Sequence, residues 1–146
     1  MRGKCKILSL STETLRDLSG YFSKHPSILS AWLFGSQASG RARPDSDVDL
    51  AVLTRAPLGW NDLSTLYVDL MALLDRDRID IVELLKAPPI LAFEAISGRE
   101  LCRKDLQAHL DFVSLTSRRY AEVMQRLDRQ NEERASLKAV LGTSEL

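Results

Sequence analysis

The stretch LFGSQASGRARPDSDVDLAVL, residues Leu33–Leu53, contains the features that decide the fold and the chemistry of this chain. It joins two apolar segments through a turn-rich connection, and the second segment carries Asp47 and Asp49 on either side of Val48. Carboxylates are seldom buried unless they are paired or bind a metal. Two of them in an otherwise apolar strand therefore indicate a functional site.

The two aspartates are predicted to share one face of this strand. Side chains alternate between the faces of a strand, so Asp47 and Asp49 point the same way, about 7 Å apart along the chain, while the apolar residues between and after them face the core. A third carboxylate, Asp80, has a similar place in the apolar segment RIDIVEL. If the two strands are neighbours, Asp80 comes within roughly 5 Å of the pair.

Three carboxylates this close need cations, because they would otherwise repel one another and raise each other's pKa values. Divalent cations such as Mg²⁺ take oxygen ligands, and two such ions can hold the attacking and leaving oxygens of a phosphoryl displacement. Gly35 and Ser36 lie where the first strand ends and a turn begins, so backbone N–H groups and a hydroxyl can face a phosphate there. The sequence thus predicts a nucleoside triphosphate site with two Mg²⁺ ions.

The rest of the chain alternates between helical and strand patterns. Helical spacing of apolar residues predicts helices over 11–25, 60–76, 88–98 and 104–141, the last one fraying beyond Glu132. Strands are predicted over 28–35, 47–53 and 78–85. This order predicts an α/β (α+β) fold, a small mixed sheet with helices packed on it. We expect one domain over residues 1–105, with residues 106–146 as its C-terminal helical extension.

Composition excludes several classes of protein. The 146 residues carry 20 basic and 20 acidic side chains, so no overall charge draws the chain to nucleic acid or to a membrane surface. Two cysteines without a CxxC spacing and two distant histidines argue against a zinc site and exclude a disulfide framework. No apolar run suits a signal peptide or a membrane span. We expect a cytoplasmic protein that binds neither membrane nor nucleic acid; a homo-oligomer stays open.

The motif GS, ten residues and then DVD resembles the signature of the nucleotidyltransferase superfamily related to DNA polymerase beta. RARPDSDVDLAVL is similar to its minimal, single-domain branch, the MNT proteins, which include MntA-type antitoxins paired with HEPN-domain ribonuclease toxins. RIDIVELLKAPPILAFEAISGRELC resembles the third-carboxylate strand of the family and the segment after it. The resemblance covers roughly Ile28–Lys104 and implies the polymerase-beta-like nucleotidyltransferase fold.

The resemblance also implies roles for individual residues. It implies that Gly35 and Ser36 hold the triphosphate, that Asp47 and Asp49 bind Mg²⁺, and that Asp80 completes the metal site and assists the attacking hydroxyl. Many relatives have an arginine where this chain has Ser39, which leaves Arg41 and Arg43 as the candidates to meet the phosphates. A P-loop is excluded, because Arg41 and Ala42 replace its lysine and its Ser/Thr.

The function implied by the resemblance is transfer of a nucleoside monophosphate, AMP from ATP, onto a hydroxyl. In MntA-type antitoxins the acceptor would be a tyrosine of the HEPN toxin partner. Two alternatives stay open: a small-molecule nucleotidyltransferase of the aminoglycoside-modifying kind, and a non-catalytic module that neutralises a toxin by contact. Arg103 and His109 match the spacing of HEPN ribonucleases, but that fold is all helical, so we interpret the match as coincidence.

Overall fold

The computed structural model describes residues 10–39 and 47–145. Arg41 and Arg43, the predicted phosphate-binding arginines, lie outside the described residues. The helices and strands follow in the order α2 (Thr12–Lys24), β1 (Ile28–Phe34), α3 (Ser36–Ser39), β2 (Val48–Thr54), α4 (Trp60–Leu74), β3 (Ile79–Glu83), the 3₁₀ helix η1 (Leu84–Lys86), α5 (Pro89–Ile96), β4 (Arg99–Arg103) and α6 (Leu106–Glu145). The predicted alternation of helices and strands is confirmed.

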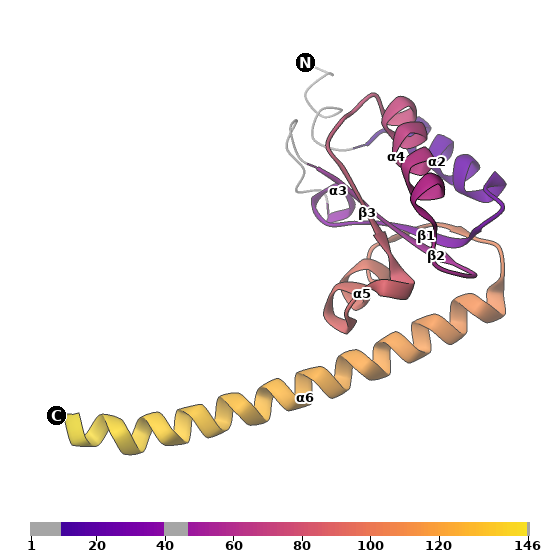
Figure 1. Ribbon diagram of the computed structural model, residues 1–146. Coiled ribbons are helices and arrows are strands. Elements are labelled where there is room, and N and C mark those ends of the chain that lie inside the picture. The colour runs from indigo at the N-terminus through magenta and orange to yellow at the C-terminus, as the bar shows by residue number, and fades with distance from the viewer. Residues whose placement is uncertain (1–9, 40–46, 146) are drawn as a thin grey trace.

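The four strands form one mixed sheet in the order β3-β2-β1-β4 (Figure 1). β1 pairs antiparallel with both β2 and β4, and β2 pairs parallel with β3. The strand β4 was not predicted, because its segment RELCR is short and three of its five residues are charged. Its backbone is ordered by pairing with β1, which a local pattern does not reveal.

Helices cover both faces of the sheet, with α2 and α4 on one side and α5 and α6 on the other (Figure 1). On one face α2 and α4 pack on a core that includes Leu18, Phe22, Val48, Leu50, Leu66 and Leu70. On the other face α5 and the first part of α6 pack on a second core, which includes Trp32, Phe34, Ala51, Leu53, Ala92 and Ala95. All seven residues of β1 are buried, which explains its uninterrupted apolar sequence apart from one serine.

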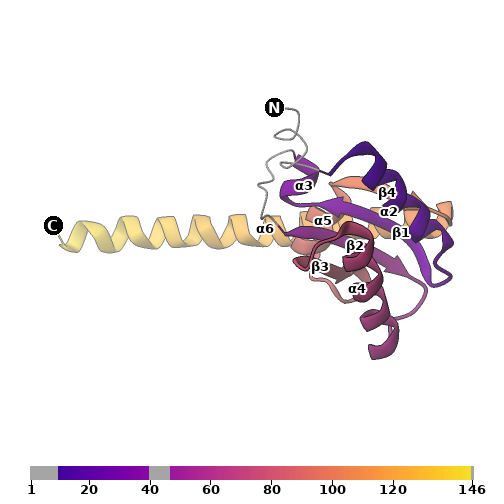
Figure 2. The same cartoon turned by 90° about the horizontal axis from the view of Figure 1, so that it is seen from above.

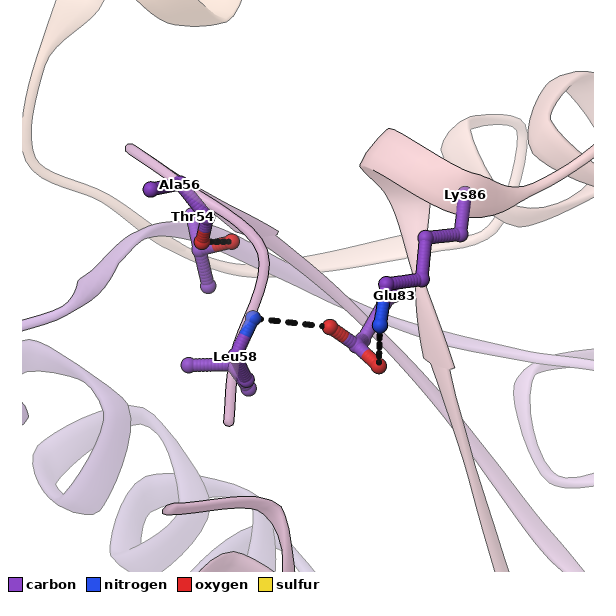
Figure 3. Close-up of polar contacts among 5 residues, drawn as sticks. All are labelled: Thr54, Ala56, Leu58, Glu83 and Lys86. Carbon is purple, nitrogen blue, oxygen red and sulfur yellow. Dashed lines mark hydrogen bonds and ion pairs between the residues drawn. The ribbon is translucent and has the colours of Figure 1, made fainter. Parts of the chain in front are cut away.

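The connection after β2 is held by the side chain of Glu83, at the end of β3 (Figure 3). Glu83 accepts a hydrogen bond from the backbone N–H of Leu58 at 3.0 Å and forms an ion pair with Lys86 at 3.3 Å. The hydroxyl of Thr54 donates to the carbonyl of Ala56 at 2.8 Å. These contacts join one end of β2 to the neighbouring strand. The opposite end of β2 carries the acidic pair.

The last helix, α6, is longer than the sequence analysis expected. It continues to Glu145, whereas fraying was predicted beyond Glu132. Its first part packs on α5, where the rings of Phe93 and Tyr120 stack with centroids 3.9 Å apart. Its last part runs clear of the sheet and its helices (Figures 1 and 2). Among the residues that the structure describes, no helix is long and apolar enough to cross a membrane.

Candidate active site

The turn at Gly35 is shaped for close approach to the acidic pair. Gly35 follows the last residue of β1 and has φ of 73°, in the left-handed region that favours glycine. A Cβ atom at this position would overlap the Asp49 carboxylate, so the backbone conformation favours glycine and any other residue would displace the Asp49 side chain. The sequence therefore places the Asp49 side chain directly against the turn that begins α3.

Asp49 and Asp80 lie side by side on neighbouring strands. β2 and β3 are parallel, and Asp49 and Asp80 are partners in their register. The two strands are therefore neighbours, which is the condition under which Asp80 was expected close to the pair. Asp47 lies one residue before β2, next to the Val48–Ile79 pair. The three carboxylates therefore lie at the same end of the sheet, where the parallel strands β2 and β3 begin.

The electrostatics of the site disfavour an ionised Asp49. Burial raises the pKa of Asp49 above its usual value, and the nearby charges of Asp80, Asp47 and Glu94 raise it further. Such a shift is the expected response of a carboxylate that faces like charges. A cation or a hydrogen-bonding ligand at this position would relieve the repulsion. Perturbed carboxylates of this kind concentrate at functional sites.

Asp47 is held by a neighbouring cation. Its carboxylate lies 2.9 Å from Nε of Arg78, the residue before β3, and both side chains are partly exposed. Over the described ranges 10–39 and 47–145, no three His, Cys, Asp or Glu side chains are gathered closely enough to form a metal centre. The donor chemistry nevertheless suits Mg²⁺, because Asp47, Asp49 and Asp80 supply carboxylate oxygens, and burial together with the nearby acidic charges raises the pKa of Asp49.

A pocket of about 450 Å³ opens beside Gly35. Its lining comes from the end of β1, α3 and the turn between α5 and β4, and consists of Phe34, Gly35, Ala38, Glu94, Ser97, Gly98 and Arg99. Gly98 packs so closely on the β1 backbone that a Cβ atom would overlap the Leu33 carbonyl. The pocket therefore lies against the same turn as the Asp49 carboxylate, with Glu94 and Arg99 as its charged residues.

Glu94 and Arg99 were missed by the sequence analysis. The signal for Glu94 was present, since it is the one charged residue in the apolar helix PILAFEAI. Arg99 carried no such signal, because it begins the strand that the sequence pattern did not predict. Of the predicted site residues, the structure brings together Gly35, Asp49 and Asp80, with Asp47 at the same edge. Ser36 begins α3 directly after Gly35.

Arg103 and His109 do not form a ribonuclease-like site. His109 is buried, its Nδ1 lies 2.8 Å from the Ser30 hydroxyl, and its ring stacks on Trp32 with centroids 5.0 Å apart. Its Nε2 lies 3.3 Å from Glu100, which also contacts Arg103 at 3.5 Å. His109 thus joins α6 to the sheet, at the end of β1 opposite to Gly35.

The comparisons with known proteins agree with this geometry. Residues 16–107 match the family model described as polymerase beta, nucleotidyltransferase. No curated protein sequence matches the chain.

Several solved structures are similar over most of the chain. One, described as a toxin-antitoxin with AMP-PNP, is 26% identical with a TM-score of 0.61, over 88% of this chain and 98% of the other. A mutant of the toxin-antitoxin MntA-HpeT is 28% identical with a TM-score of 0.56, over 88% and 93%. A third structure is described as a tri-AMPylated HEPN toxin in complex with MNT antitoxin, from Shewanella oneidensis. Its matching chain is 23% identical with a TM-score of 0.58, over 90% of this chain and 99% of the other, and at this identity the likeness shows only a shared fold.

The family match covers more than half of the chain and includes every described residue of the acidic site and of the Gly35 turn. The sheet order, the glycine turn and the register of the two aspartates are consistent with it. The chain therefore belongs to the polymerase beta nucleotidyltransferase family and is a nucleotidyltransferase.

Proposed function

We propose that this enzyme is an antitoxin that transfers AMP from ATP onto a tyrosine hydroxyl of a HEPN-type toxin partner, in a Mg²⁺-dependent reaction. The observation that carries the proposal is the register of Asp49 with Asp80 beside the Gly35 turn. This arrangement sets the Asp49 carboxylate against a backbone turn that suits a phosphate, with Asp80 beside it on the next strand. The ATP substrate and the toxin partner are consistent with a cytoplasmic protein.

The phosphate-binding role falls to the Gly35 turn. Because Gly35 has no side chain, the Asp49 carboxylate lies directly against the turn, and the exposed backbone of the turn can approach a phosphate beside it closely. The N–H groups at the start of α3 and the Ser36 hydroxyl then supply donors to phosphate oxygens. The pocket lined by Glu94 and Arg99 adjoins this turn and offers space for the rest of the nucleotide or for the acceptor.

The carboxylates Asp47, Asp49 and Asp80 would hold Mg²⁺, which neutralises charge on the phosphates when it is bound. For Asp47 this requires its carboxylate to exchange its contact with Arg78 for the new ligand. Burial and the neighbouring acidic charges raise the pKa of Asp49. A cation bound at this position would stabilise the ionised carboxylate and offset this unfavourable environment.

In the proposed reaction the acceptor oxygen forms a bond to the α-phosphorus of ATP, and the bond from that phosphorus to the oxygen bridging to the β-phosphate breaks. Pyrophosphate leaves and AMP remains on the acceptor. The hydroxyl proton passes to Asp80, whose side chain is exposed and therefore accessible to an incoming acceptor. Positioning of the two reactants supplies most of the rate, because phosphoryl transfer leaves little covalent work to the protein.

The choice of ATP and of a toxin partner is supported by the similar structures. The 26%-identical relative was crystallised as a toxin-antitoxin with AMP-PNP, an ATP analogue. The Shewanella oneidensis complex holds an AMPylated HEPN toxin. The alternative acceptor, an aminoglycoside-type small molecule, would use the same carboxylates and differ only in what enters the site.

The test uses the Asp80→Asn variant, co-expressed with a cognate HEPN toxin. The Asp80 side chain is exposed, so we expect the variant to keep the fold and to bind the toxin, which co-purification checks. We expect the wild-type chain to add one or more AMP masses to a toxin tyrosine, measured by intact mass and peptide mass spectrometry, and Asp80→Asn to add none while toxicity returns. Asp17→Asn, an exposed position on α2, is the matched control and keeps wild-type transfer.

Two outcomes would overturn the proposal. Protection by Asp80→Asn with no added mass would show a binding module that neutralises the toxin by contact. Transfer of AMP to a small hydroxylated molecule, with no mass added to the toxin, would support the aminoglycoside-type alternative.

A further inference from the structure

The helix α6 is divided into two regions with different surroundings. Between Leu106 and Met124 it contacts the sheet or α5 along one side, and Thr116 in this region is buried. From Gln125 to Leu141 every residue is exposed. Figures 1 and 2 show this second region, here called the projecting region, extending away from the body of the molecule.

The side of α6 that packs on the body continues into the projecting region with unbroken spacing. The packed residues Val113, Thr116 and Tyr120 follow one another at intervals of three and four, the spacing of a helix–helix seam. The same intervals continue through Val123, which is half-buried at the edge of the body, and then through Leu127, Gln130, Arg134, Leu137 and Leu141. In this seam Leu127 is 37% and Leu137 58% exposed, large fractions for leucine on a packing side.

We propose that the projecting region of α6 pairs with the same region of a second copy of this chain, as an antiparallel two-helix coiled coil. The seam complements itself when the two helices run antiparallel and Glu132 of one copy lies level with Glu132 of the other. Leu127 of one copy then lies opposite Leu137 of the other, and Val123 lies opposite Leu141. The remaining layers set Gln130 against Arg134. Each apolar residue meets an apolar residue, and each polar residue meets a polar one.

The charge of Arg134 selects this orientation. A parallel pair in register would place Arg134 against Arg134, and two guanidinium groups at a seam repel each other. In the antiparallel pair the guanidinium instead faces the amide oxygen of Gln130, which accepts a hydrogen bond. A polar layer of this kind specifies orientation and register at some cost in stability.

A second copy suits the seam better than an unrelated helix for a reason of symmetry. An isologous interface needs one surface that complements itself under a two-fold rotation, which the order Leu127, Gln130, Arg134, Leu137 provides. The contact from Val123 to Leu141 would be about 27 Å long at 1.5 Å per residue. It lies away from the Gly35 turn, so the inference goes beyond the proposed function and does not depend on it.

The first test is the molecular mass in solution, measured by sedimentation equilibrium over a range of concentrations. We expect the wild-type chain to dimerise, and Leu137→Glu to raise the dimer Kd at least about tenfold, because it places a charge in two apolar layers. Ala139→Glu is the matched control. It adds the same charge two residues away, off the seam, and is expected to leave the Kd unchanged.

A second test distinguishes the orientation. In a Cys5→Ser background, Cys102 is the remaining cysteine and is buried. An equimolar mixture of Leu127→Cys and Leu137→Cys chains is expected to form disulfide-linked heterodimers under mild oxidation, whereas each variant alone is not.

Three results would overturn the inference. These are a wild-type chain that stays monomeric at high micromolar concentration, a dimer that Leu137→Glu does not weaken, and homodimeric cross-links by Leu127→Cys alone. Circular dichroism of each variant checks that α6 remains folded, which we expect because the substituted positions are exposed in the single chain.

Discussion

Two polar clusters lie on the same face of the sheet, at opposite ends of β1, and differ in how their charges are satisfied. At one end His109 contacts the Ser30 hydroxyl at 2.8 Å and Glu100 at 3.3 Å. At the other end, Asp49 on β2 lies opposite Phe34, and burial together with the like charges around it raises its pKa. The first cluster is a satisfied network that stabilises the fold. The second is costly to the protein alone, which is expected of a site that binds cations and phosphates.

The largest expected effect comes from removing the charge of Asp49. We expect Asp49→Asn to lower the rate of AMP transfer by about 10³-fold or more, because one ligand of the catalytic charge cluster is lost. The unfolding free energy should not fall and should rise slightly, because the amide removes a like charge from beside Asp80. Radiolabel transfer from ATP and a urea titration measure the two quantities. A variant as active as the wild type would contradict the metal-binding role.

The next effect concerns the Gly35 turn, which lies against the Asp49 carboxylate. Gly35→Ala is expected to lower the unfolding free energy by about 1–2 kcal/mol for its left-handed backbone alone, and further through its overlap with the Asp49 carboxylate. Transfer activity should fall as well, because Asp49 must move. Gly20→Ala, in α2 with no atom near its Cβ position, is the control and is expected to stabilise the protein.

Substitution in the His109 cluster should have the opposite effect: it should lower the free energy of unfolding and leave the transfer rate unchanged. His109→Ala removes a buried ring that stacks on Trp32 and leaves Ser30 without this partner, so we expect a loss of about 2–4 kcal/mol. The rate of AMP transfer per folded molecule should be unchanged. Leu110→Ala, its exposed neighbour on α6, should change stability by less than about 0.5 kcal/mol. If His109→Ala lowered the transfer rate while the variant remained fully folded, the His109 cluster would also have a part in the chemistry, contrary to this expectation.

The smallest effect is on the pH dependence of stability. Burial lowers the pKa of His109 below its usual value of 6.5; Arg103 lowers it further, and Glu100 opposes the shift. The unfolded chain therefore takes up a proton at a higher pH than the native protein does. The stabilisation is complete above about pH 6.5 and is lost as the pH falls from there through the native pKa, at a slope below about 1.4 kcal/mol per pH unit.

Comparison of wild type with His109→Ala between pH 7.5 and 5 isolates this contribution, because His25, whose pKa is also lowered, is common to both. We expect the stability of the wild type to fall more steeply on acidification. Equal slopes would show that His109 has the same pKa in the native and the unfolded protein, and would contradict the expected shift.

Much of the fold and of the candidate site could be predicted from local sequence. The buried strand β1, the helices α2, α4 and α5, and the strands that carry Asp49 and Asp80 all follow from apolar periodicity and from glycine and proline positions. The spacing from Gly35 to Asp47 pointed to the nucleotidyltransferase family, which the family match confirms. These features are local, because each depends on residues within one element or one turn.

Tertiary structure alone decided which elements meet. The strand β4 exists because β1 offers it an edge, and Glu94 joins the acidic cluster because α5 packs on the Asp49 face of the sheet. The partner of Asp47, Arg78, is thirty-one residues away in the chain and was not foreseen. The sequence by itself determined which side chains are the candidates for the chemistry. The pairing of distant strands determined their distances and charges, because like-charge repulsion and hydrogen bonding depend on space and not on chain order.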